Sequence, residues 1–193
     1  MQKGSDNIYK NVKKQPLVIL LAGLPRTGKS TLSRRIARKY GLEHISTDSV
    51  RKRIFRGVRQ DEFGKGSYTE DRRIVVYDTI YYMSYTLLRH GIGCVLDGTF
   101  YKEYLRQKVQ RIADRFGAKF VLIEITCPDK LVKKRLQDKK RVGRMTLSDA
   151  DLNVYYTFKK LYEPIKMPHI KIDMAQDYDK IMELVDFAIR HVY

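Results

Sequence analysis

An eight-residue segment near the start of the chain constrains its fold more than any other feature. Residues 23–30, Gly-Leu-Pro-Arg-Thr-Gly-Lys-Ser, match the pattern G-x-x-x-x-G-K-[ST]. An apolar run at 17–22 precedes this segment, and a helical pattern at 29–40 follows it. Glycines allow such a strand-to-helix turn to wrap a phosphate, since its N–H groups and the helix N-terminus attract anions. The sequence therefore predicts a Walker A phosphate loop.

Each residue of this loop has an expected role. Lys29 is expected to reach the β- and γ-phosphates of a nucleotide, and the Ser30 hydroxyl to ligate Mg²⁺. Nucleotide contacts are expected from Gly23, Leu24, Pro25, Arg26, Thr27, Gly28, Lys29, Ser30 and Thr31. The chain has no N-K-x-D guanine motif, so we expect a small ATP-dependent enzyme rather than a GTPase. The alternative is an ordinary glycine-rich turn that binds nothing.

Short apolar runs alternate with longer helical patterns along the chain, which is typical of a parallel α/β sheet. We expect strands at residues 17–22, 44–47, 94–97, 120–126 and 169–172. We expect helices at residues 29–40, 48–55, 70–90, 102–116, 129–139, 148–163 and 178–193, with a loop at 57–67. The sequence thus predicts one domain over residues 16–193, after a basic and flexible lead-in at 1–15.

Composition narrows the class of protein without naming an activity. The chain has 193 residues, of which 43% are hydrophobic and 32% charged, as expected for a globular domain with its own core. The net charge of +17 indicates anionic partners, such as phosphates or nucleic acid. No apolar stretch reaches the roughly 20 residues of a membrane span. Two distant cysteines form no disulfide or metal pattern, so we expect a cytoplasmic protein. Separately, we expect a monomer or a homodimer.

Three segments together resemble a known group of enzymes. They are residues 21–32 around the phosphate loop, Ser-Thr-Asp-Ser-Val-Arg at 46–51, and Val-Leu-Asp-Gly-Thr-Phe at 95–100. They are similar to kinase-type P-loop proteins, in the group that contains polynucleotide kinase domains, zeta-toxin-like kinases and chloramphenicol phosphotransferase, an AAA_33-type ATP-binding kinase domain. The similarity extends over about residues 16–163, including Cys127-Pro128 and Ser148-Asp149-Ala150.

The resemblance implies a three-layer α/β fold and an activity. The expected sheet has five parallel strands in the order 2-3-1-4-5, and a basic lid is expected at about residues 130–147. The implied reaction is transfer of the γ-phosphoryl group of ATP, with Mg²⁺, to a hydroxyl acceptor.

The same resemblance implies roles for residues outside the phosphate loop. Asp48 would be the general base that takes the acceptor's proton, or simply a helix cap. Arg51, one turn later, would hold Asp48 or an acceptor phosphate, or else lie on a solvated face. Asp97 would hold a Mg²⁺-bound water or position the acceptor, or cap the following turn. Tyr68 would contact the substrate or belong to a plain helix start.

The expected lid is strongly basic. Its basic residues are Lys130, Lys133, Lys134, Arg135, Lys139, Lys140, Arg141 and Arg144. By resemblance, lid arginines stabilise charge on the transferred phosphoryl group, with Arg135 first and then Arg141 and Arg144. A solvated basic face is the alternative. Two positions depart from the resembling kinases: Arg26 stands where glycine is common, and Lys139 stands at the spacing of a second lid arginine.

The sequence leaves the acceptor open. The basic charge favours a 5′-hydroxyl polynucleotide, whose phosphates would be attracted to it. A nucleotide, a sugar nucleotide or a metabolite hydroxyl is the rival, and a nucleic-acid-binding protein without phosphoryl transfer is a further one. Tyr77, Tyr81 and Tyr85 recur every four residues and would either stack bases or pack in the core. The four histidines show no metal or catalytic spacing, and we expect no role for them.

Overall fold

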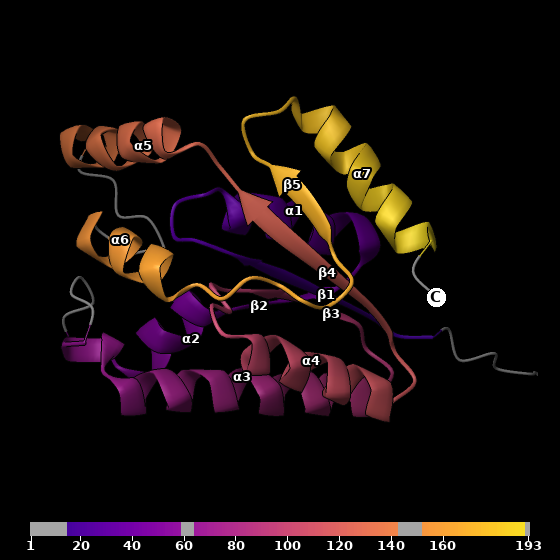
Figure 1. Ribbon diagram of the computed structural model, residues 1–193. Coiled ribbons are helices and arrows are strands. Elements are labelled where there is room, and N and C mark those ends of the chain that lie inside the picture. The colour runs from indigo at the N-terminus through magenta and orange to yellow at the C-terminus, as the bar shows by residue number, and fades with distance from the viewer. Residues whose placement is uncertain (1–14, 59–63, 143–151, 192–193) are drawn as a thin grey trace, which may run out of the picture.

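A computed structural model describes residues 15–58, 64–142 and 152–191. Strands and helices alternate along nearly the whole described chain (Figure 1). The strands are β1 (Leu17–Gly23), β2 (Glu43–Ser46), β3 (Cys94–Asp97), β4 (Lys119–Thr126) and β5 (Ile170–Asp173). The helices are α1 (Lys29–Tyr40), α2 (Thr47–Ile54), α3 (Glu70–Arg89), α4 (Glu103–Arg115), α5 (Asp129–Val142), α6 (Leu152–Leu161) and α7 (Tyr178–His191), with a 3₁₀ turn η1 (Gly66–Tyr68).

The five strands form one parallel sheet in the order β2-β3-β1-β4-β5, which confirms the predicted order. Helices α1 and α7 lie on one face of the sheet, and α3 and α4 lie on the other (Figure 1). The central strand β1 shows why a continuous apolar run is needed, since both of its faces are covered. Ile19 and Leu21 pack with α1 and α7, while Val18 and Leu20 pack with α3 and α4.

The sheet also places the functional segments. Parallel strands end at one edge, and the last pairs in register are Leu21 with Asp97 and Ser46 with Asp97. The phosphate loop after β1, the start of α2 after β2 and the turn after β3 therefore meet at the carboxyl edge of the sheet. Ligands of open α/β sheets bind at this edge.

Several element boundaries differ from those expected. Strand β2 ends at Ser46, and Thr47 already begins α2. Helix α6 ends at Leu161, two residues before the expected end at residue 163, and residues 148–151 of the expected helix lie outside the described residues. Glu163 leaves the helical path because its N–H donates to the Tyr101 carbonyl at 2.8 Å and because Pro164 follows it.

The expected lid and lead-in lie only partly within the described residues. Helix α5 runs to Val142, three residues beyond the expected end at Lys139, and the rest of the lid lies outside them. Of the lead-in, Gln15 alone is described, and its side chain donates to the Gly117 carbonyl at 2.8 Å. In the described part of the chain, no helix combines the length and apolar character needed to cross a membrane.

The tyrosines of α3 belong to the core. Tyr77 and Tyr81 are buried, with ring centroids 6.3 Å apart. Tyr85 packs edge-on against Phe116 at 5.0 Å. The packing interpretation of this stripe is therefore correct, and the base-stacking alternative is wrong for Tyr77 and Tyr81.

Candidate functional site

The phosphate loop is shaped by close backbone approaches. Gly23 donates its N–H to the Thr99 carbonyl at 3.2 Å, and a Cβ at this position would lie 2.3 Å from the Ile125 carbonyl oxygen. Only glycine fits there. Gly28 precedes α1 with a φ of 106°, and Arg26 adopts a φ of 65°. The left-handed backbone at Arg26 gives the physical reason why glycine is common at this position in the resembling kinases.

Lys29 lies at the centre of the loop. Its side chain is buried, and Nζ donates to the Leu24 carbonyl at 2.6 Å. Burial lowers the pKa of Lys29, and the nearby carboxylates of Asp97 and Asp48 counteract this only in part. The ammonium group thus lies near the charges of both acidic candidates, while among the described residues it bonds only to a loop carbonyl. A bound phosphate would supply further negative charge to stabilise this buried ammonium.

Asp97 ends β3 and is 2% exposed. Burial alone would raise its pKa, but the neighbouring His44, Lys29 and Ser30 outweigh this and lower it. Asp97 is therefore ionised at neutral pH. Its Oδ2 atom lies 3.7 Å from His44 Nε2, which is long for a hydrogen bond, and forms none with the described residues.

This donor set fits a magnesium ion. Mg²⁺ prefers oxygen ligands and keeps several waters, so it is usually bound by one or two protein groups together with substrate phosphates. Asp97 offers a buried carboxylate oxygen, and the Ser30 hydroxyl lies beside it. Among the described residues, no group of three His, Cys, Asp or Glu side chains could hold a metal on its own.

Asp48 and Arg51 form a pair on the first turns of α2. Arg51 Nη1 lies 2.6 Å from Asp48 Oδ1, and the guanidinium stacks 4.3 Å from the centre of the Tyr68 ring. Arg51 is only 5% exposed, so it does not lie on a solvated face. Burial would lower its pKa, but Tyr68 and Asp48 outweigh this and raise it. Asp48 is not the cap of α2, because the cap position is Ser46.

Unpartnered polar atoms lie beside this pair. Arg51 Nε and Ser67 Oγ are buried and form no hydrogen bond with the described residues. Buried polar groups are nearly always paired, so such atoms need an explanation, for which a ligand is one. The part of the site around Arg51 and Tyr68 is thus enclosed and cationic, and some of its polar atoms have no hydrogen-bond partner among the described residues.

The two acidic turns approach each other closely. A Cβ at Gly98 would lie 2.6 Å from Thr47 Cγ2, so the residue after Asp97 must be glycine for the start of α2 to fit. Since the charges of Asp97 and Asp48 both act on Lys29, these three side chains lie near one another at this edge.

Arg135 lies on the opposite side of the phosphate loop. From α5, its Nη1 donates to the Thr27 carbonyl at 3.0 Å and lies 3.4 Å from Cys127 Sγ. Its Nη2 reaches the Met174 carbonyl at 3.5 Å. The guanidinium therefore holds loop carbonyls in this structure. For Arg141, only the backbone place in α5 is described, and Arg144 lies outside the described residues.

His44 is a site residue that the sequence analysis missed. Its Nε2 atom lies 2.9 Å from Ser33 Oγ and 3.7 Å from Asp97 Oδ2. No motif spacing marks it. The available signal was strand register: residues two apart on a strand share a face, and His44 stands two before Ser46, the partner of Asp97 in β3.

Fold and site together define a P-loop protein of the kinase type. Residues 18–165 match the AAA_33 family, an AAA domain, and the chain belongs to that family. An uncharacterised protein of Mycobacterium tuberculosis is 38% identical over 113 residues, which are 56% of this chain and 22% of that protein. The chain thus spans about a fifth of the length of this relative.

Other similar proteins are kinases or share the fold. The L-seryl-tRNA(Sec) kinase of Methanococcus maripaludis is 25% identical over 86% of this chain and 63% of its own. Chaetomium thermophilum Kti12, solved with ADP-AlF3, has a TM-score of 0.68 and 15% identity, covering 91% of this chain and 99% of its own. The Mycobacterium tuberculosis APS kinase CysC, solved with AMPPNP and APS, has a TM-score of 0.63 and 16% identity, covering 91% and 98%.

Proposed function

We propose that this protein transfers the γ-phosphoryl group of ATP to the hydroxyl group of an anionic acceptor. The observation that carries the proposal is the convergence of Asp48 and Lys29. A carboxylate that can accept a hydroxyl proton and an ammonium that can bind phosphate act on each other at one sheet edge. Family membership supports a phosphotransferase of this kind.

In the proposed mechanism the protein acts mainly by placing charges. Lys29 and the N–H groups of the loop hold the terminal phosphates of ATP. Arg51 fixes the Asp48 carboxylate through Oδ1, so that its other oxygen can take the proton of the acceptor hydroxyl. The hydroxyl oxygen bonds to the γ-phosphorus as the bond from that phosphorus to the bridging oxygen breaks, and ADP leaves. Arg135 and the other lid arginines, Arg141 and Arg144, are proposed to stabilise charge on the nucleotide once it is bound.

Magnesium is part of this proposal as a cofactor. Ser30 and Asp97 are the residues that would hold it, and it would neutralise charge on the phosphates. The N–H groups of the loop and Lys29 would then have less negative charge left to balance.

For the acceptor we propose a 5′-hydroxyl polynucleotide. The net charge of +17 would attract its phosphates, and the buried guanidinium of Arg51 offers a place for the phosphate nearest the reacting end. A relative that phosphorylates a tRNA-linked seryl group supports an acceptor of this size. The rival is a small anionic hydroxyl compound, which the enclosure of Arg51 and Tyr68 favours.

The experiment is phosphoryl transfer from γ-labelled ATP with Mg²⁺. The acceptors are 5′-hydroxyl RNA and DNA oligonucleotides, the same oligonucleotides already 5′-phosphorylated, and a panel of nucleosides and sugar nucleotides. Asp48→Asn should lower kcat by about 100-fold or more, because general bases contribute about 10²- to 10⁴-fold. The affinity of the Asp48→Asn variant for ATP should not change. Asp78→Asn, an exposed acid on α3, is the control and should leave kcat unchanged.

Each result decides between named alternatives. Label on 5′-hydroxyl oligonucleotides alone supports the polynucleotide acceptor. Label only on small molecules supports the rival acceptor and makes the basic surface incidental. If ATP and oligonucleotides bind but no acceptor is labelled, a nucleotide-dependent nucleic-acid-binding protein replaces the kinase proposal.

A further inference from the structure

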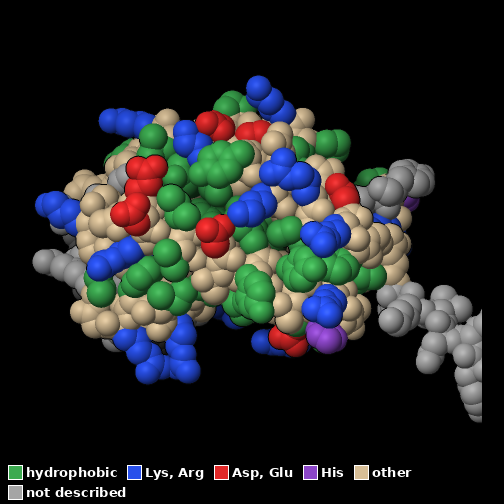
Figure 2. Space-filling model, turned by 90° about the horizontal axis from the view of Figure 1, so that it is seen from below, with side chains coloured by type: hydrophobic (Ala, Val, Ile, Leu, Met, Phe, Trp, Pro, Cys, Tyr) green, Lys and Arg blue, Asp and Glu red, His purple; other side chains and the backbone are tan. Residues whose placement is uncertain are grey.

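Helix α3 has exposed apolar side chains on its outer face as well as buried ones on its inner face. Val76 and Ile80 are buried against the sheet, whereas Val75 and Tyr82 are 45% and 72% exposed. Exposed apolar patches on a protein surface often mark sites of interaction with another molecule. Figure 2 shows the face formed by α3 and α4, where hydrophobic side chains lie between basic ones without a covering element. Within the described part of the chain, nothing covers this side of α3.

The outer face has the spacing of a helix-pairing seam. Val75, Thr79, Tyr82 and Thr86 follow one another in steps of four, three and four residues. This alternation is that of the contact positions between two packed helices. The Thr79 hydroxyl donates to the Val75 carbonyl at 2.8 Å, and the Thr86 hydroxyl donates to the Tyr82 carbonyl at 2.9 Å. The polar groups of both threonines are thus satisfied within the helix. We call these four residues the outer seam of α3.

Opposite charges stand at the two ends of the seam. Asp71 lies in the first turn of α3 and Arg89 in the last, and both are exposed. They are 18 residues apart, which is five turns at about 3.6 residues per turn, so both project from the same side of the helix. In an antiparallel pair of identical helices, Asp71 of each copy would lie beside Arg89 of the other.

From this arrangement we propose that the outer seam of α3 is a homodimer interface, with α3 of two copies packed antiparallel about a two-fold axis. The symmetry matters because a two-fold interface must be complementary to itself. Antiparallel pairing satisfies both charged ends at once, whereas parallel pairing would place like charges together. An acidic partner or an acidic membrane surface would attract Arg89 but repel Asp71 and Asp78.

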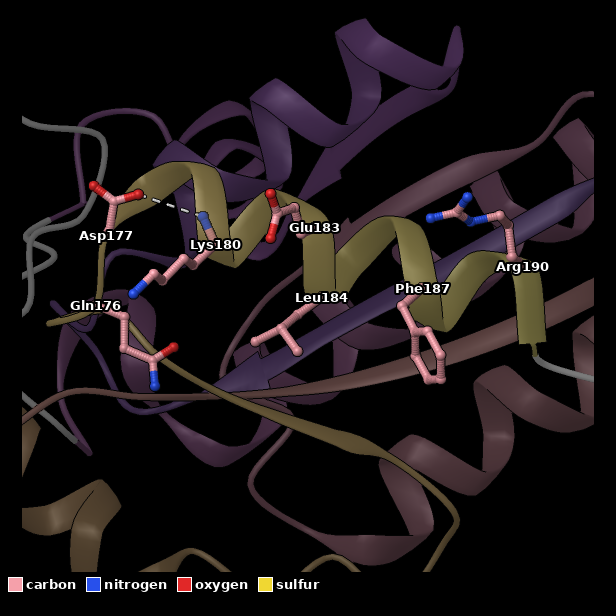
Figure 3. Close-up of a pocket in the computed structure, with 7 residues that line it drawn as sticks. All are labelled: Gln176, Asp177, Lys180, Glu183, Leu184, Phe187 and Arg190. Atoms are coloured by element: carbon pink, nitrogen blue, oxygen red, sulfur yellow. Dashed lines mark hydrogen bonds between the residues drawn. The ribbon is translucent and has the colours of Figure 1, made fainter.

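A second exposed apolar surface provides a comparison. Leu184 and Phe187 project from α7 into a shallow pocket (Figure 3). Lys180, Glu183 and Arg190 line the same pocket, so charged side chains interrupt the apolar ones at each turn. This surface has no continuous apolar seam, and it therefore serves as the control.

The test is the oligomeric state of the full chain by sedimentation equilibrium over a range of concentrations. We expect a dimer. Val75→Glu and Tyr82→Glu should each raise the dimer dissociation constant by about 30-fold or more, since central interface residues have effects of this size. Phe187→Glu on α7 should leave the dissociation constant unchanged. Circular dichroism and thermal unfolding of the separated monomers establish that each variant is folded.

A charge exchange tests the antiparallel arrangement itself. Asp71→Arg and Arg89→Asp should each weaken the dimer, and the double variant should restore it, because each end is again a pair of opposite charges. A monomeric wild-type chain at every soluble concentration would overturn the proposal. So would a dimer that α7 substitutions dissociate and α3 substitutions do not.

Discussion

At the scale of single residues, Lys29 shows a conflict between stability and function. Its ammonium is buried beside Asp97 and Asp48, and yet burial lowers its pKa overall. Between that lowered pKa and the usual 10.5, the unfolded chain binds more protons than the folded chain, so stability rises with pH in this window. At neutral pH, which lies below the usual pKa, the buried charge therefore lowers the free energy of unfolding.

Replacing this charge should stabilise the ligand-free protein. We expect Lys29→Met to raise the midpoint of thermal unfolding at pH 7 and to flatten the alkaline pH dependence, since Met keeps the length of the side chain without its charge. Phosphoryl transfer should be lost. Lys39→Met is the control, because Lys39 is half-exposed and pairs with Asp186 at 2.7 Å. Its effect should stay within about 1 kcal/mol. A lower midpoint for Lys29→Met would contradict this account.

Site residues differ in how far they could be predicted from the sequence. The phosphate loop could be predicted because its chemistry requires glycines, Lys29 and Ser30 at fixed spacing. That Asp48 and Asp97 both lie near Lys29 could be predicted only from resemblance, since 49 positions separate the two acids along the chain. The contact between His44 and Asp97 was missed, because strand register was its only signal and because the sequence pattern does not say which ring nitrogen faces the carboxylate.

At the scale of elements, Arg106 of α4 connects segments that lie far apart in the chain. It is fully buried, and its guanidinium bonds to the carbonyls of Phe100 at 2.6 Å and Glu163 at 3.0 Å. It also forms an ion pair with Glu103 at 2.6 Å. Phe100 adopts a φ of 43°, which a non-glycine residue keeps only when its surroundings hold it. Arg106 thus supports the turn that follows Asp97.

Removing this guanidinium should destabilise the fold strongly. We expect Arg106→Met to lower the free energy of unfolding by about 3–5 kcal/mol, because several buried acceptors and the Glu103 carboxylate lose their partner. Urea unfolding measures this change. Arg111→Met, an exposed arginine on the same helix, should change it by less than about 0.5 kcal/mol. A small loss for Arg106→Met would mean that water replaces the guanidinium at these carbonyls.

Most elements could be predicted from the sequence, because the alternation of apolar runs and helical patterns is strong. The element boundaries that were predicted wrongly depend on contacts between segments that are distant in the sequence. Helix α6 ends early because the Glu163 N–H bonds to Tyr101, a residue of another connection. Nothing local marks this end except Pro164. The exposed apolar side chains of α3 could not be predicted either, since periodicity alone cannot distinguish a covered helix face from an open one.

At the scale of the whole molecule, the net charge of +17 indicates an anionic partner. Charge alone cannot say whether that partner is a polynucleotide or a small phosphate compound. The two differ in the number of counterions that binding releases. A single strand that contacts Z phosphates gives a slope of roughly −0.7Z when the logarithm of the association constant is plotted against the logarithm of the salt concentration.

We expect oligonucleotide binding to show a slope of roughly −2 to −3.5, which corresponds to about three to five phosphate contacts. Fluorescence anisotropy of a labelled 5′-hydroxyl oligonucleotide, titrated at several salt concentrations with the ATP analogue AMPPNP present, measures the slope. Arg51→Gln should make the slope less negative by about 0.7, the share of one phosphate, if Arg51 binds the acceptor end. A slope near −0.7 for the unmodified chain would mean that only one phosphate is contacted. The site would then recognise the acceptor end alone, as a small-molecule kinase would, and the remaining basic residues would have no part in binding.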